Sequence, residues 1–229
     1  MNTKNHHYKT AGLIVSYLLK LCIVALLSIS IYQQQWVWVF GSTLALTISL
    51  IPTILKRNYQ ITLPLALDIL IVTALLLHVG GGLLDAYHTI PYYDSLTHFT
   101  SAFFVAFLSF VVIYTLHVYW ASLKMDKYAM ALLVVFCTIA MGVVWEFNEW
   151  ISDLVFHTAE QWGYTDTIKD LSINALAGTI MALIGVSMIK KGSFNEMTED
   201  FSKHIDKKII QKLKEKYEKK KEAKRDAGS

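Results

Sequence analysis

Charged residues and cysteines are scarce in this sequence. Asp, Glu, Lys and Arg together make up 17% of its 229 residues, against 54% for apolar residues. Eight of the 21 Lys and Arg residues fall in residues 1–189, and the other 13 are crowded into residues 190–229. This distribution indicates a transmembrane domain, assigned to residues 1–191, followed by a basic tail over residues 192–229.

Several known kinds of functional site are also missing. The two cysteines, Cys22 and Cys137, lie inside apolar runs, which favours small packing residues over a disulfide or a metal-binding pair. The sequence has no HExxH, CxxC or ExxH ligand motif, no P-loop and no serine nucleophile elbow. We expect no cleavable signal peptide, because the first apolar run is long and has no small-residue cleavage site.

Six apolar runs, each of about 20 residues, dominate the rest of the chain. An apolar helix of that length crosses the roughly 30 Å hydrocarbon core of a bilayer. The runs therefore predict an all-α, polytopic membrane protein, built as a six-helix transmembrane bundle without a sheet. The predicted helices cover about residues 12–32, 36–55, 61–79, 95–119, 127–150 and 168–189.

Basic residues mark alternate loops of this bundle. Apart from Lys169, the loops on one side lack them, so the positive-inside rule predicts a multi-pass protein of the cell membrane with both termini cytoplasmic. The basic residues on the predicted cytoplasmic side are Lys4, Lys9, Lys56, Arg57, Lys124, Lys127, Lys190 and Lys191.

The opposite, extracytoplasmic side is predicted to be acidic, with eight carboxylates against Lys169. An ionised group near hydrocarbon costs several kcal/mol unless it has a partner, water or a metal. We therefore predict that the polar residues of this side meet in one site, with its deepest members about 5–10 Å inside the helix ends. The candidates are His78, Asp94, His98, Glu146, Glu149, Asp153, Asp166, Asp170 and Asn174.

Helical spacing supports this convergence, because residues three or four apart share a helix face. Asp94 and His98 are one turn apart in "YYDSLTHF". Glu146, Glu149 and Asp153 form a stripe in "MGVVWEFNEWISDL", and Asp166, Asp170 and Asn174 form another in "YTDTIKDLSINALAG".

Carboxylates and an imidazole on three helices are suitable ligands for a divalent cation, whose identity the pattern leaves open. The sequence predicts His98, Glu146 and Asp170 as metal ligands, and Asp94, Asp166 and Glu149 as catalytic residues. A structural alternative is that Asp94, and Thr165 or Asp166, cap helix N-termini. Capping does not explain Glu146 and Glu149, which lie near a helix C-terminus where the dipole disfavours anions.

Three further features have structural interpretations. Lys20 and Asp68 lie at similar depth and are expected to form an ion pair. Gly80, Gly81 and Gly82 predict a flexible or tightly turned loop, whereas Gly178 and Gly185 give the last helix a thin face for close packing.

The basic tail has its own apolar period of four, which predicts one amphipathic cytoplasmic helix. We expect it to contact the lipid surface or water, and its lysines do not indicate nucleic acid. The apolar positions are Phe201, Ile205, Ile209, Leu213 and Tyr217.

Four stretches, "HVGGGL", "YYDSLTHF", "WEFNEW" and "GYTDTIKDLSINALAG", resemble the YjdF-like family of prokaryotic inner-membrane proteins. They lie between about residues 78 and 185. The resemblance implies a membrane protein of a family whose members have no assigned activity.

More distantly, "YDSLTHF" and "DLSINALAGTIMALIG" resemble the VanZ-like family, which is linked to resistance against glycopeptide and lipopeptide antibiotics. Asp94, His98, Asp170, Leu171 and Asn174 match that family's pattern. "WEFNEW" departs from it, since the VanZ-like helix usually has a single acid followed by Gln.

Three functions agree with these observations. The first is a metal-dependent enzyme acting at the outer leaflet on a lipid or lipid-linked substrate. The second is an ion-coupled transporter, although the first three helices offer little polar lining. The third is a non-catalytic adaptor whose polar network stabilises the bundle. Membrane lipids are the expected partners, and the sequence leaves protein partners open.

Overall fold

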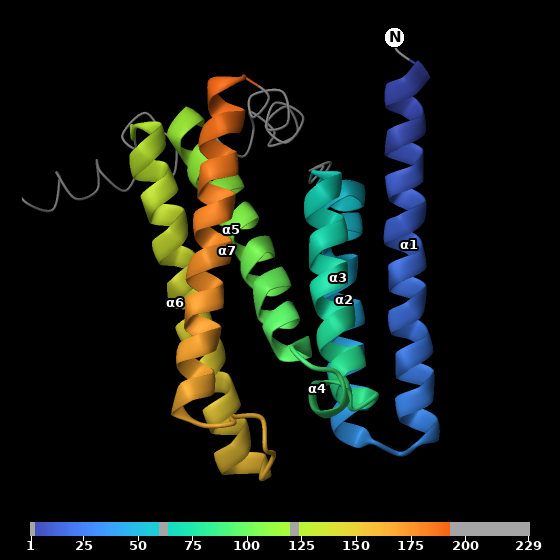
Figure 1. Cartoon of the computed structure of the whole chain (residues 1–229). Coiled ribbons are helices and arrows are strands. Elements are labelled where there is room, and N and C mark those ends of the chain that lie inside the picture. Colours follow the sequence, from blue (N-terminus) through green and yellow to red (C-terminus); the bar gives the residue numbers. More distant parts are fainter. Residues whose placement is uncertain (1–2, 60–63, 120–123, 193–229) are drawn as a thin grey trace, which may run out of the picture.

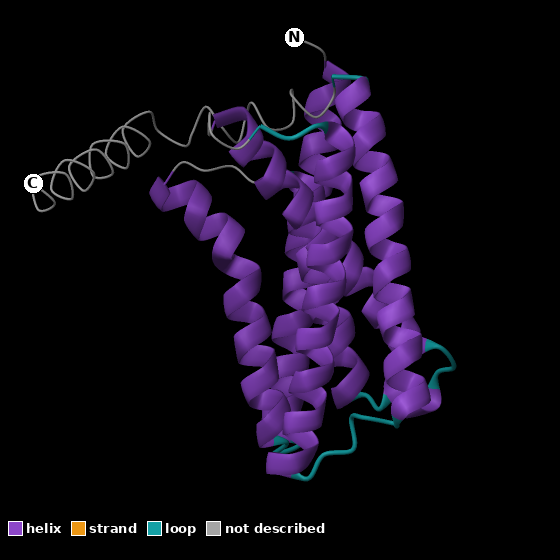
Figure 2. Ribbon diagram, turned by 90° about the vertical axis from the view of Figure 1, so that its left-hand side faces the viewer, coloured by secondary structure: helices purple, strands orange, loops and turns teal. Residues whose placement is uncertain are grey.

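The computed structural model describes residues 3–59, 64–119 and 124–192, and the regular structure of these ranges is helical throughout (Figure 2). This confirms the all-α prediction. Six helices are long and apolar enough to cross a membrane, and α4 is a single turn between two of them. The helices are α1 (Thr3–Tyr32), α2 (Trp36–Tyr59), α3 (Leu65–Leu83), α4 (Ala86–Thr89), α5 (Tyr93–Tyr119), α6 (Lys127–Phe156) and α7 (Tyr164–Lys190). The amphipathic helix expected in the basic tail lies outside the described residues.

The membrane helices form two groups of three (Figure 1). In one group α1, α2 and α3 pack on each other around Ile23 and Val72, both fully buried. In the other group α5, α6 and α7 pack around Phe110 and Val134, which are also fully buried. Contacts between α3 and α5 join the two groups.

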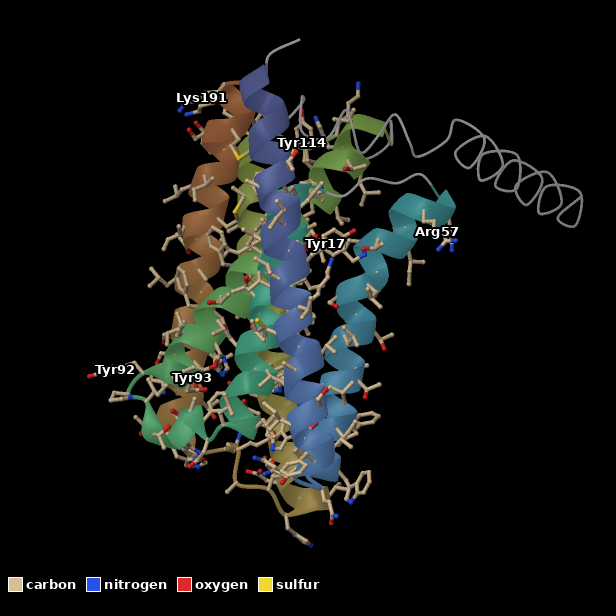
Figure 3. The ribbon with its side chains drawn as sticks, turned by 90° about the vertical axis from the view of Figure 1, so that its right-hand side faces the viewer. Tyr17, Arg57, Tyr92, Tyr93, Tyr114 and Lys191 are labelled. Carbon is tan, nitrogen blue, oxygen red and sulfur yellow. The ribbon has the colours of Figure 1, made fainter. Side chains whose placement is uncertain are left out.

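The two ends of the bundle differ in character (Figure 3). Tyr92 and Tyr93 lie at the end that carries α4, the start of α5 and α7 and the end of α6, which we call the acidic end. Arg57 and Lys191 lie at the other end, which we call the basic end. The separation of charge expected between alternate loops is therefore present in the fold.

Helices α3, α6 and α7 reach further at the acidic end than hydropathy predicts, α3 by continuing past residue 79 to Leu83. Helix α6 continues past residue 150 to Phe156, and α7 begins at Tyr164 rather than at residue 168. The predicted spans end where the apolar runs give way to mainly polar sequence, whereas α6 and α7 continue because charged side chains such as Asp153 and Asp166 find partners at the acidic end. Glu146 and Asn174 are each ten residues from their helix end, or about 15 Å at 1.5 Å per residue, so they are deeper than expected.

The prediction of a loop at the three consecutive glycines is wrong, because Gly80, Gly81 and Gly82 belong to α3. Their lack of a side chain serves packing instead of a turn. A Cβ on Gly81 would meet the rings of Tyr87 and Tyr93, and one on Gly82 would overlap the ring of Trp38. Tertiary contacts with aromatic rings thus stabilise a helix that the local sequence disfavours.

The expected ion pair is confirmed in the first group of helices. Lys20 Nζ lies 3.1 Å from Asp68 Oδ1, and Ser16 Oγ donates to Asp68 Oδ2 at 2.6 Å. All three residues are buried. The carboxylate of Asp68 is therefore neutralised and hydrogen-bonded inside the apolar bundle.

The thin face of α7 is confirmed too. A Cβ on Gly185 would overlap the ring of Phe110, which is fully buried and has no room to move, and one on Gly178 would lie 3.1 Å from Thr138 Cβ. We expect Gly185→Ala to destabilise the protein by about 1–3 kcal/mol through overpacking. Thermal unfolding in detergent measures the effect.

Gly41→Ala is the matched control, since its added Cβ would make only ordinary contact with Trp38, at 3.7 Å. Because alanine favours a helix, this control should be neutral or slightly stabilising. Equal unfolding temperatures for the two variants would contradict the packing argument.

Candidate metal centre

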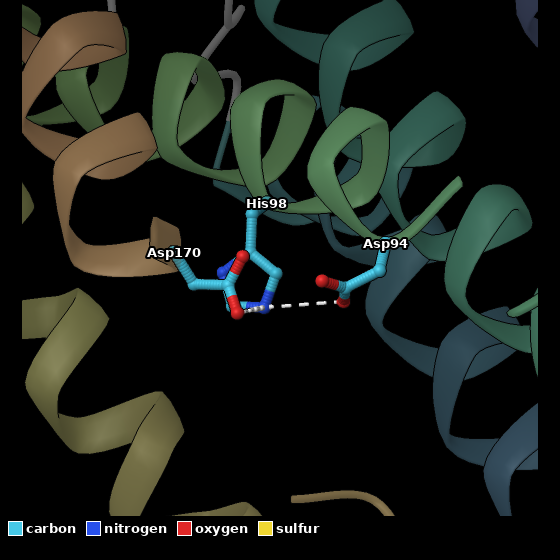
Figure 4. Close-up of side chains that lie close together, drawn as sticks. All are labelled: Asp94, His98 and Asp170. Carbon is cyan, nitrogen blue, oxygen red and sulfur yellow. Dashed lines mark ion pairs between the residues drawn. The ribbon is translucent and has the colours of Figure 1, made fainter. Parts of the chain in front are cut away.

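Side chains from three helices meet at the acidic end of the second group. Helix α5 supplies Asp94 and His98, α6 supplies Glu146 and Glu149, and α7 supplies Asp170. In Figure 4 dashed lines join the His98 ring to the carboxylates of both Asp94 and Asp170. The convergence expected from helical spacing is therefore present.

His98 is the common member of the cluster. Its Nε2 atom lies 3.5 Å from Asp94 Oδ1, 3.8 Å from Glu149 Oε1 and 4.0 Å from Asp170 Oδ2. Ligand atoms of Asp94, His98 and Asp170 all lie within 4.8 Å of one another, and so do those of His98, Glu146 and Glu149. The two possible ligand sets share one imidazole.

These separations suit a shared cation better than direct hydrogen bonds. An N–H···O bond usually measures about 2.7–3.2 Å, which is shorter than all three His98 distances. Two ligand atoms that are each about 2.1 Å from one ion lie roughly 3–4 Å apart. The donor set of one imidazole and several carboxylates can hold a divalent metal.

Two buried carboxylate oxygens provide a second, independent sign of a ligand. Within the described part of the chain, neither Glu146 Oε1 nor Asp170 Oδ1 has a hydrogen-bond partner. Glu146 is 7% exposed and Asp170 1% exposed. An unsatisfied buried acceptor of this kind costs about 1–3 kcal/mol or more, which a bound cation would offset.

Among the residues that the structure describes, Lys169 is the lysine that faces this acidic group. Lys169 Nζ lies 2.5 Å from Asp166 Oδ1, 3.2 Å from Asp94 Oδ2 and 3.6 Å from Asp170 Oδ1. Five carboxylates lie close to Lys169 or to His98, and a single ammonium group cannot balance their negative charge. They are Asp94, Glu146, Glu149, Asp166 and Asp170. Like charges about 4 Å apart repel by about 4 kcal/mol at an effective dielectric of 20, so further positive charge or protons are needed.

A pocket of about 120 Å³ adjoins the cluster. Five of the sequence candidates line it, namely Asp94, His98, Glu149, Asn174 and, from α3, His78. Its remaining lining residues are Tyr87, Thr97, Ser101, Ala102, Val105, Thr138, Met141, Gly142 and Trp145. The cluster therefore has an adjacent space that a substrate or water can enter.

His78 connects this pocket to the first group of helices. Its Nδ1 atom is 3.0 Å from the hydroxyl of Tyr87, and its ring meets Trp145 edge to face with the centroids 5.0 Å apart. Burial raises the pKa of the Tyr87 phenol above its usual range, so this group stays protonated near neutral pH.

Two candidates lie apart from the cluster. Asp153 accepts hydrogen bonds from Thr158 Oγ1 and from the backbone N–H groups of Glu160 and Gln161, so it holds the loop that follows α6. Asp166 reaches the cluster only through Lys169.

The alternative explanation by helix capping is wrong for the residues named. Asp94 is the second residue of α5, where its carboxylate pairs with His98 and Lys169. Helix α7 starts at Tyr164 with Gly163 at the cap position and no side-chain cap bond, so neither Thr165 nor Asp166 caps it. Because both helices begin before these residues, the carboxylate of Asp94 is free to join the cluster and that of Asp166 pairs with Lys169.

Sequence reasoning gave no site role to Lys169, Tyr87 or Trp145. Lys169 had a usable signal, since it lies between Asp166 and Asp170 on a predicted helix. Trp145 also had one, since it lies four residues before Glu149 on a predicted helix, whereas Tyr87 had none and joins the site because α4 packs on α3 and α5. Trp145 Nε1 donates to Glu149 Oε1 at 2.7 Å, which fixes that carboxylate beside His98.

A search of curated proteins and a search of solved structures each gave no match. A family model described as "Predicted membrane protein (DUF2238)" matches residues 14–191, a range that contains every residue of the cluster. The match confirms the resemblance to the YjdF-like family. Since it covers well over half of the chain, the protein belongs to the DUF2238 family of predicted membrane proteins.

Proposed function

We propose that this protein is a metal-dependent enzyme of the cell membrane that acts on a lipid or lipid-linked substrate at the extracytoplasmic side. The observation that carries the proposal is the convergence of His98 with carboxylates of three helices, two of which keep a buried oxygen without a hydrogen bond. The basic residues at the opposite end support the orientation, because such residues favour the cytoplasmic side.

The cluster offers distinct places for binding and for proton transfer. His98, Glu146 and Asp170 are the proposed ligands, since each of the two carboxylates has an oxygen within 4.8 Å of an imidazole nitrogen and a buried oxygen without a hydrogen bond. A divalent cation there would polarise a phosphoryl or carbonyl oxygen and favour deprotonation of water. Asp94 and Glu149 line the pocket and are placed to accept that proton, whereas Asp166 positions Lys169.

The packing below the pocket supports an enzyme over a transporter. Phe107, Phe110, Val111 and Met181 fill the space between α5, α6 and α7 toward the basic end, and all of them are buried. An ion crossing this apolar core would lose its hydration without gaining ligands.

Phospholipid turnover by the full chain in vesicles tests the proposal. The vesicles contain phosphatidylglycerol and phosphatidylethanolamine labelled separately in the headgroup and in an acyl chain, with Mg²⁺, Mn²⁺ or Zn²⁺ supplied. We expect release of one label that stops on chelation. Glu149→Gln should lower the rate at least about 100-fold if Glu149 transfers the proton.

Asp153→Asn is the matched control, because Asp153 belongs to the same stripe of α6 but binds the following loop. Its rate should stay within about two-fold of the wild-type rate, as expected for a carboxylate away from the reacting atoms. Absence of metal-dependent release from either label, or an equal loss in both variants, would contradict the proposal.

A further inference from the structure

We propose that an acyl chain of a membrane lipid enters the pocket sideways from the bilayer, between α3 and α6, and lies against Ala102, Val105 and Thr138 with its polar group at the cluster. This inference rests on the proposed function for the reaction and adds the substrate class, a membrane lipid held by its acyl chain, together with its route of entry.

The pocket changes from polar to apolar with depth. Asp94, His98 and Glu149 line it at the acidic end, whereas Ala102 and Val105 line it further along α5. Val105 follows His98 by seven residues, which places it about 10 Å deeper in the membrane-spanning part of the helix. An amphiphile with its polar group at the cluster would therefore have its first methylenes in the apolar part.

Thr138, the deepest residue of α6 that lines the pocket, does not need a hydrogen bond from a ligand. Thr138 Oγ1 donates to the backbone oxygen of Val134 at 2.8 Å, within its own helix. Burying methylenes beside this residue therefore leaves no donor unsatisfied, whereas a polar group placed there would find no partner in this side chain. The deep part of the pocket thus favours a hydrocarbon chain over a polar group.

The wall between α3 and α6 consists of side chains. Among the described residues these two helices do not pack on each other, and the contact between the His78 and Trp145 rings spans the gap. Met141 and Trp145 line the pocket and are also 50% and 38% exposed. On a membrane-spanning helix that exposure means contact with lipid, so this wall separates the pocket from the bilayer.

The size of the pocket limits what enters. Its volume of about 120 Å³ is below the roughly 300–1,000 Å³ of sites that enclose a drug-sized ligand. It therefore takes a segment of one chain beside the polar group, and the rest of the lipid stays in the bilayer. Rearrangement of the Trp145 side chain is the smallest change that opens this route.

Photolabelling of the full chain in nanodiscs tests this inference. The probe is phosphatidylglycerol with a diazirine in one acyl chain, and mass spectrometry locates the labelled residues. We expect labelling at Ala102, Val105 or Thr138. Ala102 is 6% exposed and Thr138 1% exposed, so lipids surrounding the protein do not reach them.

A pair of matched variants sharpens the result. Ala102→Leu fills the deep part of the pocket with a larger side chain. It should reduce labelling there at least about five-fold, because the acyl chain loses the space that it would occupy. Ala140→Leu makes the same change on the exposed face of α6, away from the pocket lining, and should leave labelling unchanged.

Labelling confined to exposed positions such as Leu132 and Phe136, with none at the buried lining residues, would overturn the inference. So would full labelling at Val105 and Thr138 in a folded Ala102→Leu variant. If that variant does not fold, the labelling pattern of the wild-type protein alone decides.

Bound metal is measured on the same samples, which separates this inference from the proposed function. Metal without deep labelling refutes only the lipid route. Deep labelling without metal refutes only the proposed metal enzyme.

Discussion

Replacing His98 by alanine is expected to weaken binding of a divalent metal at least about 100-fold, because even groups outside the ligand shell typically contribute 10–100-fold. His98 belongs to both ligand sets, so its loss leaves neither set complete. Purified wild-type protein should carry about one ion per chain after dialysis, and His98→Ala close to none. Elemental analysis by mass spectrometry measures both.

Thermal unfolding gives a second measure of the same prediction. A ligand at 100 times its Kd stabilises the folded state by about 2.7 kcal/mol, so adding Mn²⁺ should raise the Tm of the wild-type protein but not that of His98→Ala. Glu146→Gln should behave like His98→Ala, since it removes an oxygen that has no other partner.

His88→Ala is the matched control for this measurement. His88 lies at the same end of the bundle and pairs with Asp85 at 2.6 Å, but it is exposed and outside both ligand sets. Its metal content should equal that of the wild type. Metal-free wild-type protein, or unchanged metal content in His98→Ala, would show that the cluster is not a metal centre.

Removing the carboxylate of Asp68 is expected to cost about 3–5 kcal/mol, the usual effect of breaking a buried ion pair. Lys20 is 7% exposed and would keep a charged ammonium group in an apolar bundle without its 3.1 Å partner. At about 2–4 °C per kcal/mol for a chain of this size, the Tm of Asp68→Ala in detergent should fall by roughly 6–20 °C.

The double variant Lys20→Met with Asp68→Leu should recover most of that loss, because it removes both charges and keeps the volume. Asp85→Ala breaks the exposed pair with His88 and should cost about 1 kcal/mol or less. A Tm for Asp68→Ala no lower than that of Asp85→Ala would mean that the buried pair does not stabilise the fold.

The membrane architecture could be predicted because hydropathy is a local property. Each apolar run has to be long enough to cross the bilayer and must satisfy its backbone hydrogen bonds internally, so length and composition alone predict the helices. The pairing of Lys20 with Asp68 could also be predicted, because the two residues have opposite charges at similar depth. In an apolar surrounding, an ion pair costs less free energy than two separate charges.

The helix ends and the glycine segment could not be predicted, because contacts between distant residues decide them. Hydropathy places these helix ends near residues 150 and 168, where the apolar runs stop, yet α6 runs to Phe156 and α7 starts at Tyr164. Glycines favour a turn in isolation, but the ring of Trp38 packs against Gly82 and keeps α3 helical.

The sequence by itself determined the number and order of membrane helices, the separation of an acidic from a basic end, and the helix faces that carry Asp94, His98, Glu146 and Asp170. These follow from apolar length, charge and the helical repeat, which need no knowledge of packing. Only the tertiary structure decided that the faces of α5, α6 and α7 meet around His98, that Asp153 holds a loop instead, and that Tyr87, Trp145 and Lys169 complete the site. The physical reason is that helix rotation and neighbour choice depend on contacts between side chains far apart in the chain, and no local pattern encodes those contacts.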